Sequence, residues 1–227
     1  MKTKLVIRYV LNQVLGIVGM AVALFWSAGR IDWWPAWAAI AVWLICFTME
    51  DIAIIRFNPD LMAERLSPPK GAKTWDKAIT SILRITELAR YILAGLDLRY
   101  GWTHGFPLSA QIAASTVCVL SYALFVWAMA SNTFFSQIVR IQANRGHAVA
   151  TSGPYHYVRH PGYAGMILFE FGISALLASW WALVAGGLCA ILLIIRTALE
   201  DRTLQAELPG YMDYAHQVRY RLLPAIW

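Results

Sequence analysis

The sequence predicts an all-α, polytopic integral membrane protein that folds as a helical bundle, and three observations support this prediction. Apolar residues make up 59% of the 227-residue chain, while charged residues contribute only 14%. The mean hydropathy of +0.53 is well above that of soluble domains. The apolar residues also gather in long runs without the alternation of barrel strands. Because backbone groups inside a bilayer must bond within their own segment, these runs are expected to be helices.

Three apolar runs are long enough to cross a membrane by themselves. Each has the roughly 20 residues that a spanning helix needs, and they cover residues 10–28, 34–55 and 107–130. Two shorter runs, residues 166–179 and 180–195, meet at a pair of tryptophans. Because indole rings prefer the headgroup level, we expect a helical hairpin whose tip lies at the membrane interface.

Residues 75–96 are a further candidate span, although Arg84, Glu87 and Arg90 interrupt their apolar pattern. Basic residues favour the cytoplasmic side of a membrane. With the N-terminal basic residues inside, the basic stretch at residues 56–77 falls inside after two spans, and the stretch at residues 140–159 falls inside only if residues 75–96 also cross. We therefore predict about six spans with both termini cytoplasmic, and we expect the three charged side chains to face protein or water. The basic residues in this argument are Lys2, Lys4, Arg8, Arg56, Arg65, Lys70, Lys73, Lys77, Arg140, Arg145 and Arg159.

The net charge of +6 does not indicate nucleic-acid binding, because the basic residues flank the apolar runs and form no stripe with aromatic residues. Anionic membrane lipids are the expected partners. Cys46, Cys118 and Cys189 lie inside apolar runs, so neither a disulfide nor a thiolate metal site is expected. His156 and His160 are separated by a predicted loop-to-helix junction and lack a third ligand, so we expect no metal.

A first polar cluster lies between residues 140 and 165, where three of the five histidines occur. A turn is predicted at Gly153 and Pro154, since glycine can take a positive φ and proline fixes its own φ. Pro161 predicts a helix start, because proline is tolerated in the first turn and restricts His160 before it. The free N–H groups of that helix end are typical of an anion or ligand site.

A second polar cluster, residues 196–202, ends the last apolar run. Because the last two runs form a hairpin, the two polar clusters are expected to converge on one cytoplasmic pocket. Arg196 and Glu200 share a helix face, and taken alone they could simply be an i,i+4 ion pair. Glu170 lies inside the hairpin and is either a functional acid or a buried partner of interior charges.

Together these residues resemble the isoprenylcysteine carboxyl methyltransferase family, to which the phospholipid methyltransferases are related. The resemblance covers roughly residues 132–227, and the ordered combination of its motifs is specific although each motif is weak. The motifs are Gly153-Pro-Tyr-x-Tyr-Val-Arg-His160-Pro-x-Tyr163-x-Gly165, Arg196-x-x-x-Glu200-Asp201, Tyr211-x-x-Tyr214 and Arg221-Leu-Leu-Pro224. We therefore expect a single membrane domain, with membrane helices over residues 1–106, where only apolar spans are visible, and a methyltransferase-like core over residues 107–227.

The resemblance also implies the activity and the site. Family members bind S-adenosylmethionine in a cytoplasmic pocket, while a lipid or lipidated substrate arrives from the bilayer, which favours transfer to a prenylcysteine-like carboxylate. Arg196 would face that carboxylate, and Arg196 and Glu200 would be the catalytic residues. The implied cofactor contacts are Gln142, His147, Ala148, Val149, Ala150, Tyr155, His160, Pro161, Gly162, Tyr163, Glu200 and Asp201. Methyl transfer is an in-line displacement, so catalysis would consist chiefly of alignment and desolvation.

Three alternatives remain open at this point. A phospholipid or other amine acceptor would need a general base, for which Glu200 or Glu170 would be candidates. NADPH-dependent membrane sterol reductases share a similar His-Pro-x-Tyr and Tyr-Arg-x-x-Pro arrangement, and Arg145, Arg159 and Arg202 could bind the phosphates of that cofactor. The third alternative is a non-enzymatic membrane scaffold, whose function would not require the two polar clusters to meet.

Overall fold

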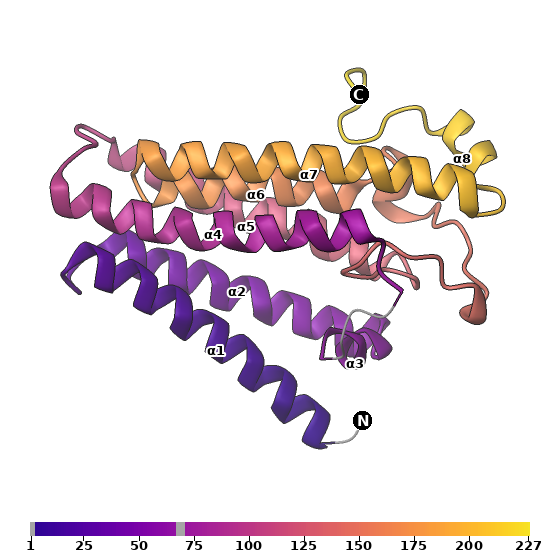
Figure 1. The fold of residues 1–227 in the computed structure, drawn as a ribbon, viewed down its shortest axis with the longest axis horizontal. Helices are drawn as coiled ribbons and strands as arrows, with labels where there is room; N and C mark the ends of the chain where they lie inside the picture. Colours follow the sequence, from indigo (N-terminus) through magenta and orange to yellow (C-terminus); the bar gives the residue numbers. More distant parts are fainter. Residues whose placement is uncertain (1–2, 67–70) are drawn as a thin grey trace.

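The computed structural model, described over residues 3–66 and 71–227, is an all-helical bundle (Figure 1). Its long helices in this part of the chain are α1 (Thr3–Ala28), α2 (Trp34–Phe57), α4 (Thr74–Tyr100), α5 (Leu108–Ala130), α6 (Pro161–Leu176) and α7 (Trp180–Glu207). The short ones are α3 (Asp60–Arg65), the 3₁₀ turns η1 (Ala143–Arg145) and η2 (Gly153–His156), and α8 (Tyr211–Gln217). The all-α prediction is confirmed. Lys2 and Lys70, used in the topology argument, lie outside the described residues.

The long helices run back and forth along one axis (Figure 1). Helix α4 packs against α1 and α7, α5 packs against α2 and α6, and α6 packs against α7. The described ends of the chain lie at the same end of the bundle as α3 and α8. The predicted α6–α7 hairpin is therefore confirmed, and it brings the first turn of α6 beside the last turns of α7.

Membrane spans are indicated for four of the described helices: α1, α2, α5 and α7 are long and apolar enough to cross a bilayer. Helix α6 is apolar but has only 16 residues. Helix α4 has 27 residues, a length of about 40 Å at 1.5 Å per residue, but it carries several charges. The chain is thus a multi-pass helical membrane protein with four candidate spans, accompanied by two further helices of the same bundle.

The charged residues of α4 do not all meet the same surroundings. Arg90 is buried between helices and forms an ion pair with Glu170 of α6, which is also buried. Arg84 remains exposed, and Glu87 is half-buried. Of the two sequence interpretations of Glu170, the structure therefore supports the buried partner of an interior charge. A buried pair of this kind ties α4 to α6, because removing either partner would leave an uncompensated charge.

Close helix packing in the C-terminal half depends on glycines. A Cβ atom at Gly165 of α6 would lie 2.5 Å from the Ser121 carbonyl oxygen of α5. A Cβ atom at Gly186 of α7 would lie 2.9 Å from the Glu170 carbonyl oxygen of α6. Since real side chains do not approach this closely, the two glycines allow α6 to pack tightly against both neighbours and fix where its first turn lies.

Candidate functional site

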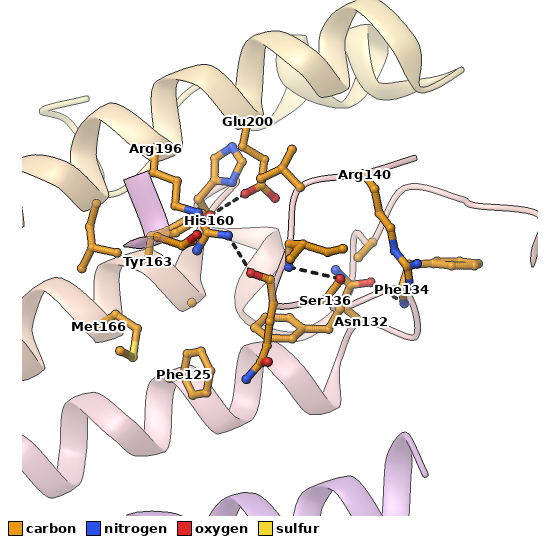
Figure 2. Close-up of a pocket in the computed structure, with 18 of the residues that line it drawn as sticks. Phe125, Asn132, Phe134, Ser136, Arg140, His160, Tyr163, Met166, Arg196 and Glu200 are labelled. Atoms are coloured by element: carbon orange, nitrogen blue, oxygen red, sulfur yellow. Dashed lines mark hydrogen bonds between the residues drawn. The ribbon is translucent and has the colours of Figure 1, made fainter. Parts of the chain in front are cut away.

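A cavity of about 950 Å³ lies where the α6–α7 hairpin meets the connecting segments and α4. Both polar clusters of the sequence contribute to its wall, as the hairpin argument predicts. The predicted site residues that line it are His147, Ala148, Val149, Ala150, Tyr155, His160, Gly162, Tyr163, Arg196 and Glu200. Figure 2 shows Arg196 and Glu200 of α7 and Tyr163 of α6 close together on one side, with Met166 and Phe125 nearby.

The start of α6 follows the local sequence rules. Gly153 has a φ of +60° at the beginning of η2, and α6 begins at Pro161 with His160 as the residue before it. Gly162 in the first turn faces Phe135, whose ring would lie 3.4 Å from an added Cβ atom. The predicted turn and helix start are both confirmed. They place His160, Gly162 and Tyr163 along one edge of the cavity.

The side chain of Arg196 extends from α7 to α4. Its Nε donates to Asp76 Oδ1 at 2.7 Å, and its Nη2 donates to the Gln137 carbonyl oxygen at 2.7 Å. The guanidinium also lies over the Tyr163 ring, 5.5 Å from its centroid. Asp76 is fully buried. Arg196 is therefore fixed through two donors, while no described residue forms a hydrogen bond with its Nη1.

Glu200 does not pair with Arg196, so the simple i,i+4 ion pair considered from the sequence is wrong. Its Oε2 instead accepts a hydrogen bond from the Tyr163 hydroxyl at 2.5 Å. Within the described chain, no hydrogen bond engages its second carboxylate oxygen, Oε1. A carboxylate with one oxygen held and one available can accept a hydrogen bond from a ligand or pair with its positive group.

Asp201 lies behind the cavity and is not part of its lining. Its carboxylate is fully buried and saturated with partners. It accepts hydrogen bonds from Arg159 at 2.8 and 3.0 Å, Arg221 at 2.8 Å and the Tyr211 hydroxyl at 3.0 Å, and it lies 3.1 Å from His160 Nε2. We call this group the Asp201 cluster. It joins α7, α8, the start of α6 and the C-terminal segment at one point.

The backbone around Arg159 extends this connection. The Arg159 and His160 amides donate to the carbonyl oxygens of Tyr220 and Arg221, each at 2.9 Å. Burial opposes the charge of Arg159, but its hydrogen bonds to Asp201 raise its pKa above the ordinary value. Burial also raises the pKa of Tyr211, and the Asp201 charge raises it further, so this hydroxyl is a donor at neutral pH. The C-terminal segment thus closes the back of the site.

Gln142 and Pro161 also lie outside the cavity lining. The side-chain amide of Gln142 donates to the Phe134 carbonyl oxygen at 2.8 Å and accepts from Arg145 at 2.8 Å. Its backbone N–H donates to His147 Nδ1 at 3.3 Å. Gln142 therefore organises the segment that carries His147. Direct contact of a cofactor with Gln142, Pro161 or Asp201 stays a prediction.

His147 lines the cavity and accepts a hydrogen bond from the connecting segment. Burial lowers the pKa of its imidazole below the ordinary value; the Glu200 carboxylate opposes this shift and Arg145 adds to it. The ring lies tilted against Phe134, with 4.8 Å between centroids and 36° between the ring planes. Since the Nδ1 atom accepts the Gln142 N–H, the proton of the neutral ring is placed on Nε2.

The sequence interpretation missed the wall formed by α2, α4, α5 and the segment just after α5. Six cavity-lining residues there are aromatic or apolar, namely Trp43, Phe47, Leu83, Tyr122, Phe125 and Phe135. Several of them form an aromatic group, with 6.0 Å between the ring centroids of Trp43 and Tyr122 and 5.5 Å between those of Phe125 and Phe135. In the sequence they lie in apolar runs or just beyond one, so no polar signal marked them. They give the cavity a hydrocarbon-like side opposite its charged groups.

The fold and cavity together define a polytopic helical membrane protein with a mixed polar and apolar site between helices. The isoprenylcysteine carboxyl methyltransferase (ICMT) family model matches residues 113–206, which run from α5 through most of α7. A protein-S-isoprenylcysteine O-methyltransferase of Schizosaccharomyces pombe is 32% identical over 75 residues. That similarity covers 33% of this chain and 32% of the relative. The resemblance to the family is thus confirmed over residues 113–206, while α1 to α4 and residues 207–227, with the Tyr211 and Arg221 motifs, lie outside the family match.

Proposed function

We propose that this protein is an S-adenosylmethionine-dependent methyltransferase that modifies a carboxylate of a lipid or lipidated substrate at the membrane. One observation supports this proposal most directly. A single cavity joins a polar side, with Tyr163, Arg196 and Glu200, to an aromatic and apolar side formed by α2, α4 and α5. A water-soluble cofactor and an apolar acceptor need these two surfaces in contact. The family match over residues 113–206 supports the same activity.

The residues present fit the chemical groups of this cofactor. Glu200 has a carboxylate oxygen for its ammonium or ribose hydroxyls, and the tyrosine rings of the lining can face a sulfonium cation. Ala148 and Val149 offer an apolar slot for an adenine ring. When bound, the cofactor supplies an electrophilic methyl group. We propose that Gln142, Pro161 and Asp201 support these contacts by holding His147 and His160 in place.

Arg196 is the proposed partner of the acceptor carboxylate. A carboxylate is ionised at neutral pH and needs positioning more than deprotonation. Since Asp76 and the Gln137 carbonyl hold the guanidinium through Nε and Nη2, the Nη1 side can receive the acceptor without a change of side-chain conformation. Only 12% of the Arg196 side chain is exposed, so a bound acceptor would leave little room for water at the transfer. Arg196 and Glu200 would thus act on opposite reactants.

We further propose six membrane crossings with the cavity and both termini on the cytoplasmic side. The back-and-forth course of α1, α2, α4, α5, α6 and α7 supports an even number of crossings. Most basic residues outside the apolar runs lie near the end where the described chain begins and ends, as the positive-inside rule requires. Within this arrangement residues 107–227 would carry the cofactor contacts, and residues 1–106 would complete the acceptor side.

Binding and transfer measurements on the purified full chain in nanodiscs would test this function. We expect binding of S-adenosylhomocysteine and methyl transfer from labelled S-adenosylmethionine to N-acetyl-S-farnesylcysteine. Tight binding of NADPH without S-adenosylhomocysteine would instead identify a reductase, and binding of neither would favour a scaffold. If phosphatidylethanolamine were methylated and no carboxylate ester formed, the acceptor would be an amine instead of a carboxylate.

A further inference from the structure

The cations that line the cavity are not all held in ion pairs. In the described chain, six lysine and arginine side chains line it, and four of them are held by carboxylates. Those pairs are Arg65–Glu50, Arg140–Glu64, Arg159–Asp201 and Arg196–Asp76. The other two are Lys77 and Arg84, both on α4, and neither forms an ion pair with a described residue. Glu87 interacts electrostatically with Arg84 but does not form an ion pair with it.

Lys77 and Arg84 occupy one face of α4. They are seven residues apart, which is two helical turns, and the rise between them is about 10 Å. Thr80 and Ser81 lie between them and also line the cavity. Both hydroxyls donate to backbone carbonyls of their own helix at 2.8 Å, so they offer lone pairs but no free hydrogen. The two cations are therefore the donors that this face presents to a ligand.

This cationic face begins next to the proposed acceptor site. Asp76, the residue before Lys77, holds Arg196 at 2.7 Å. From there the face runs along α4 to Arg84, ten residues beyond Thr74 and about 15 Å into the helix. A cation at this depth is costly if it faces lipid alone, which favours a position beside water or an anion.

We propose that Lys77 and Arg84 form an anion subsite for a second acidic group of the methyl acceptor. The preferred substrate would then be an amphiphile with two anionic groups. Its methylated carboxylate would lie at Arg196, and a further carboxylate or phosphate would lie along α4. The identification of the ligand as a methyl acceptor rests on the proposed methyltransferase function. The anion subsite itself does not depend on methyl transfer.

Two matched acceptors test the subsite. N-acetyl-aspartyl-S-farnesylcysteine carries a second carboxylate, and its asparaginyl counterpart has the same shape without that charge. We expect the KM of the aspartyl acceptor to be about tenfold lower, as one charge-assisted contact would give. In the variant with both Lys77→Gln and Arg84→Gln, this ratio should fall to about one. Arg99→Gln, on the same helix but outside the cavity lining, should leave the ratio unchanged.

A binding measurement separates the subsite from the activity. Dodecyl phosphate and dodecanol would be titrated into the purified protein, with S-adenosylhomocysteine binding as a check that each variant is folded. Loss of the preference for dodecyl phosphate in the double variant alone would support the subsite even if no methyl transfer were found. The proposal is overturned if the folded double variant keeps its preference for the anionic probes. An equal loss in Arg99→Gln would also overturn it, because the effect would then be general attraction to a basic surface.

Discussion

Arg159 and Arg196 each pair with a fully buried aspartate, but the two pairs have different surroundings. Asp201 accepts from two arginines and a tyrosine, and it lies behind the cavity. Among the described charged side chains, Asp76 binds only Arg196, and Arg196 itself lies in the cavity wall. The first pair is closed to ligands and holds segments together, whereas the second leaves part of its guanidinium available. An arginine–aspartate motif therefore gains its role from how completely its donors are used.

The two pairs also connect different parts of the chain. The Asp201 cluster joins elements of the C-terminal half, and both Arg159 and Asp201 fall inside the family match at residues 113–206. The Arg196 pair joins that half to α4, which lies outside the match. The proposed cofactor side of the cavity is thus built mainly from the part that resembles the family. The proposed acceptor side also includes α2 and α4, which lie outside the family match.

Breaking the Arg159–Asp201 pair, which is closed to ligands, should have the largest effect. Asp201→Ala leaves Arg159 buried without its partner, and breaking a buried pair costs about 3–5 kcal/mol. We expect a marked fall in thermal stability and a loss of S-adenosylhomocysteine binding of more than about 100-fold, since 1.4 kcal/mol corresponds to tenfold. Asp213→Ala, at an exposed position of α8, is the matched control. Unchanged unfolding and affinity would show that the Asp201 cluster is not structural.

Breaking the Arg196–Asp76 pair, the open pair, should affect turnover more than folding. Arg196→Ala removes the proposed carboxylate contact, and losing such a charged partner costs about 2–5 kcal/mol. We expect kcat/KM for N-acetyl-S-farnesylcysteine to fall by about 100-fold or more, with S-adenosylhomocysteine affinity changed by only a few fold. Arg202→Ala, exposed on the same helix, serves as control. An equal loss of cofactor affinity would instead place Arg196 in the cofactor site.

Asp76→Asn would sharpen the comparison by keeping the shape of the open pair while removing its negative charge. The amide oxygen can still accept from Arg196, but Val139 N–H loses its partner if the amide nitrogen replaces Oδ2. We expect a fall in kcat of about tenfold, corresponding to about 1.4 kcal/mol. The effects of Asp76→Asn and Arg196→Ala should not add in the double variant, because both act on one contact. Full additivity would contradict a positioning role for Asp76.

Tyr163→Phe should have a smaller effect on the cofactor side. It removes one hydrogen bond to Glu200, which contributes about 1 kcal/mol, while the aromatic ring remains. We expect S-adenosylhomocysteine affinity to fall about fivefold by calorimetry. Tyr157→Phe, at an exposed tyrosine near the same segment, is a suitable control. An unchanged affinity would show that the hydrogen bond between Tyr163 and Glu200 does not contribute to cofactor binding.

The smallest expected effect is a pH dependence from His147. Its pKa lies below the ordinary value of about 6.5, so the neutral ring prevails at pH 7. As the pH falls through the lowered pKa, protonation removes the acceptor for the Gln142 N–H and adds positive charge beside a cationic cofactor. S-adenosylmethionine affinity should therefore be constant above pH 6.5 and weaken a few fold below it. In His147→Gln this weakening should disappear, and its persistence would assign the titration to another group.

Much of the site's framework could be predicted from the sequence because the signals are local. The Pro161 helix start, the positive φ of Gly153 and the hairpin around Ser179 depend on residues within a few positions of each other. From the hairpin alone it follows that the two polar clusters converge. Composition and run length likewise determine the membrane class, since each apolar run must satisfy its own backbone in lipid.

Tertiary structure decided which charges meet. Nothing in the spacing of residues 76 and 196 predicts their contact, because α4 and α7 come together only when the bundle packs. The same holds for the pairing of Arg90 with Glu170, and for the saturation of Asp201 by partners from the start of α6, α8 and the C-terminal segment. Periodicity reports which face of a helix is apolar, but the neighbour of that face is set by packing between distant elements. The sequence by itself therefore determined the membrane class and the location of the candidate site, and only the folded bundle distinguished the Arg159–Asp201 pair from the Arg196–Asp76 pair.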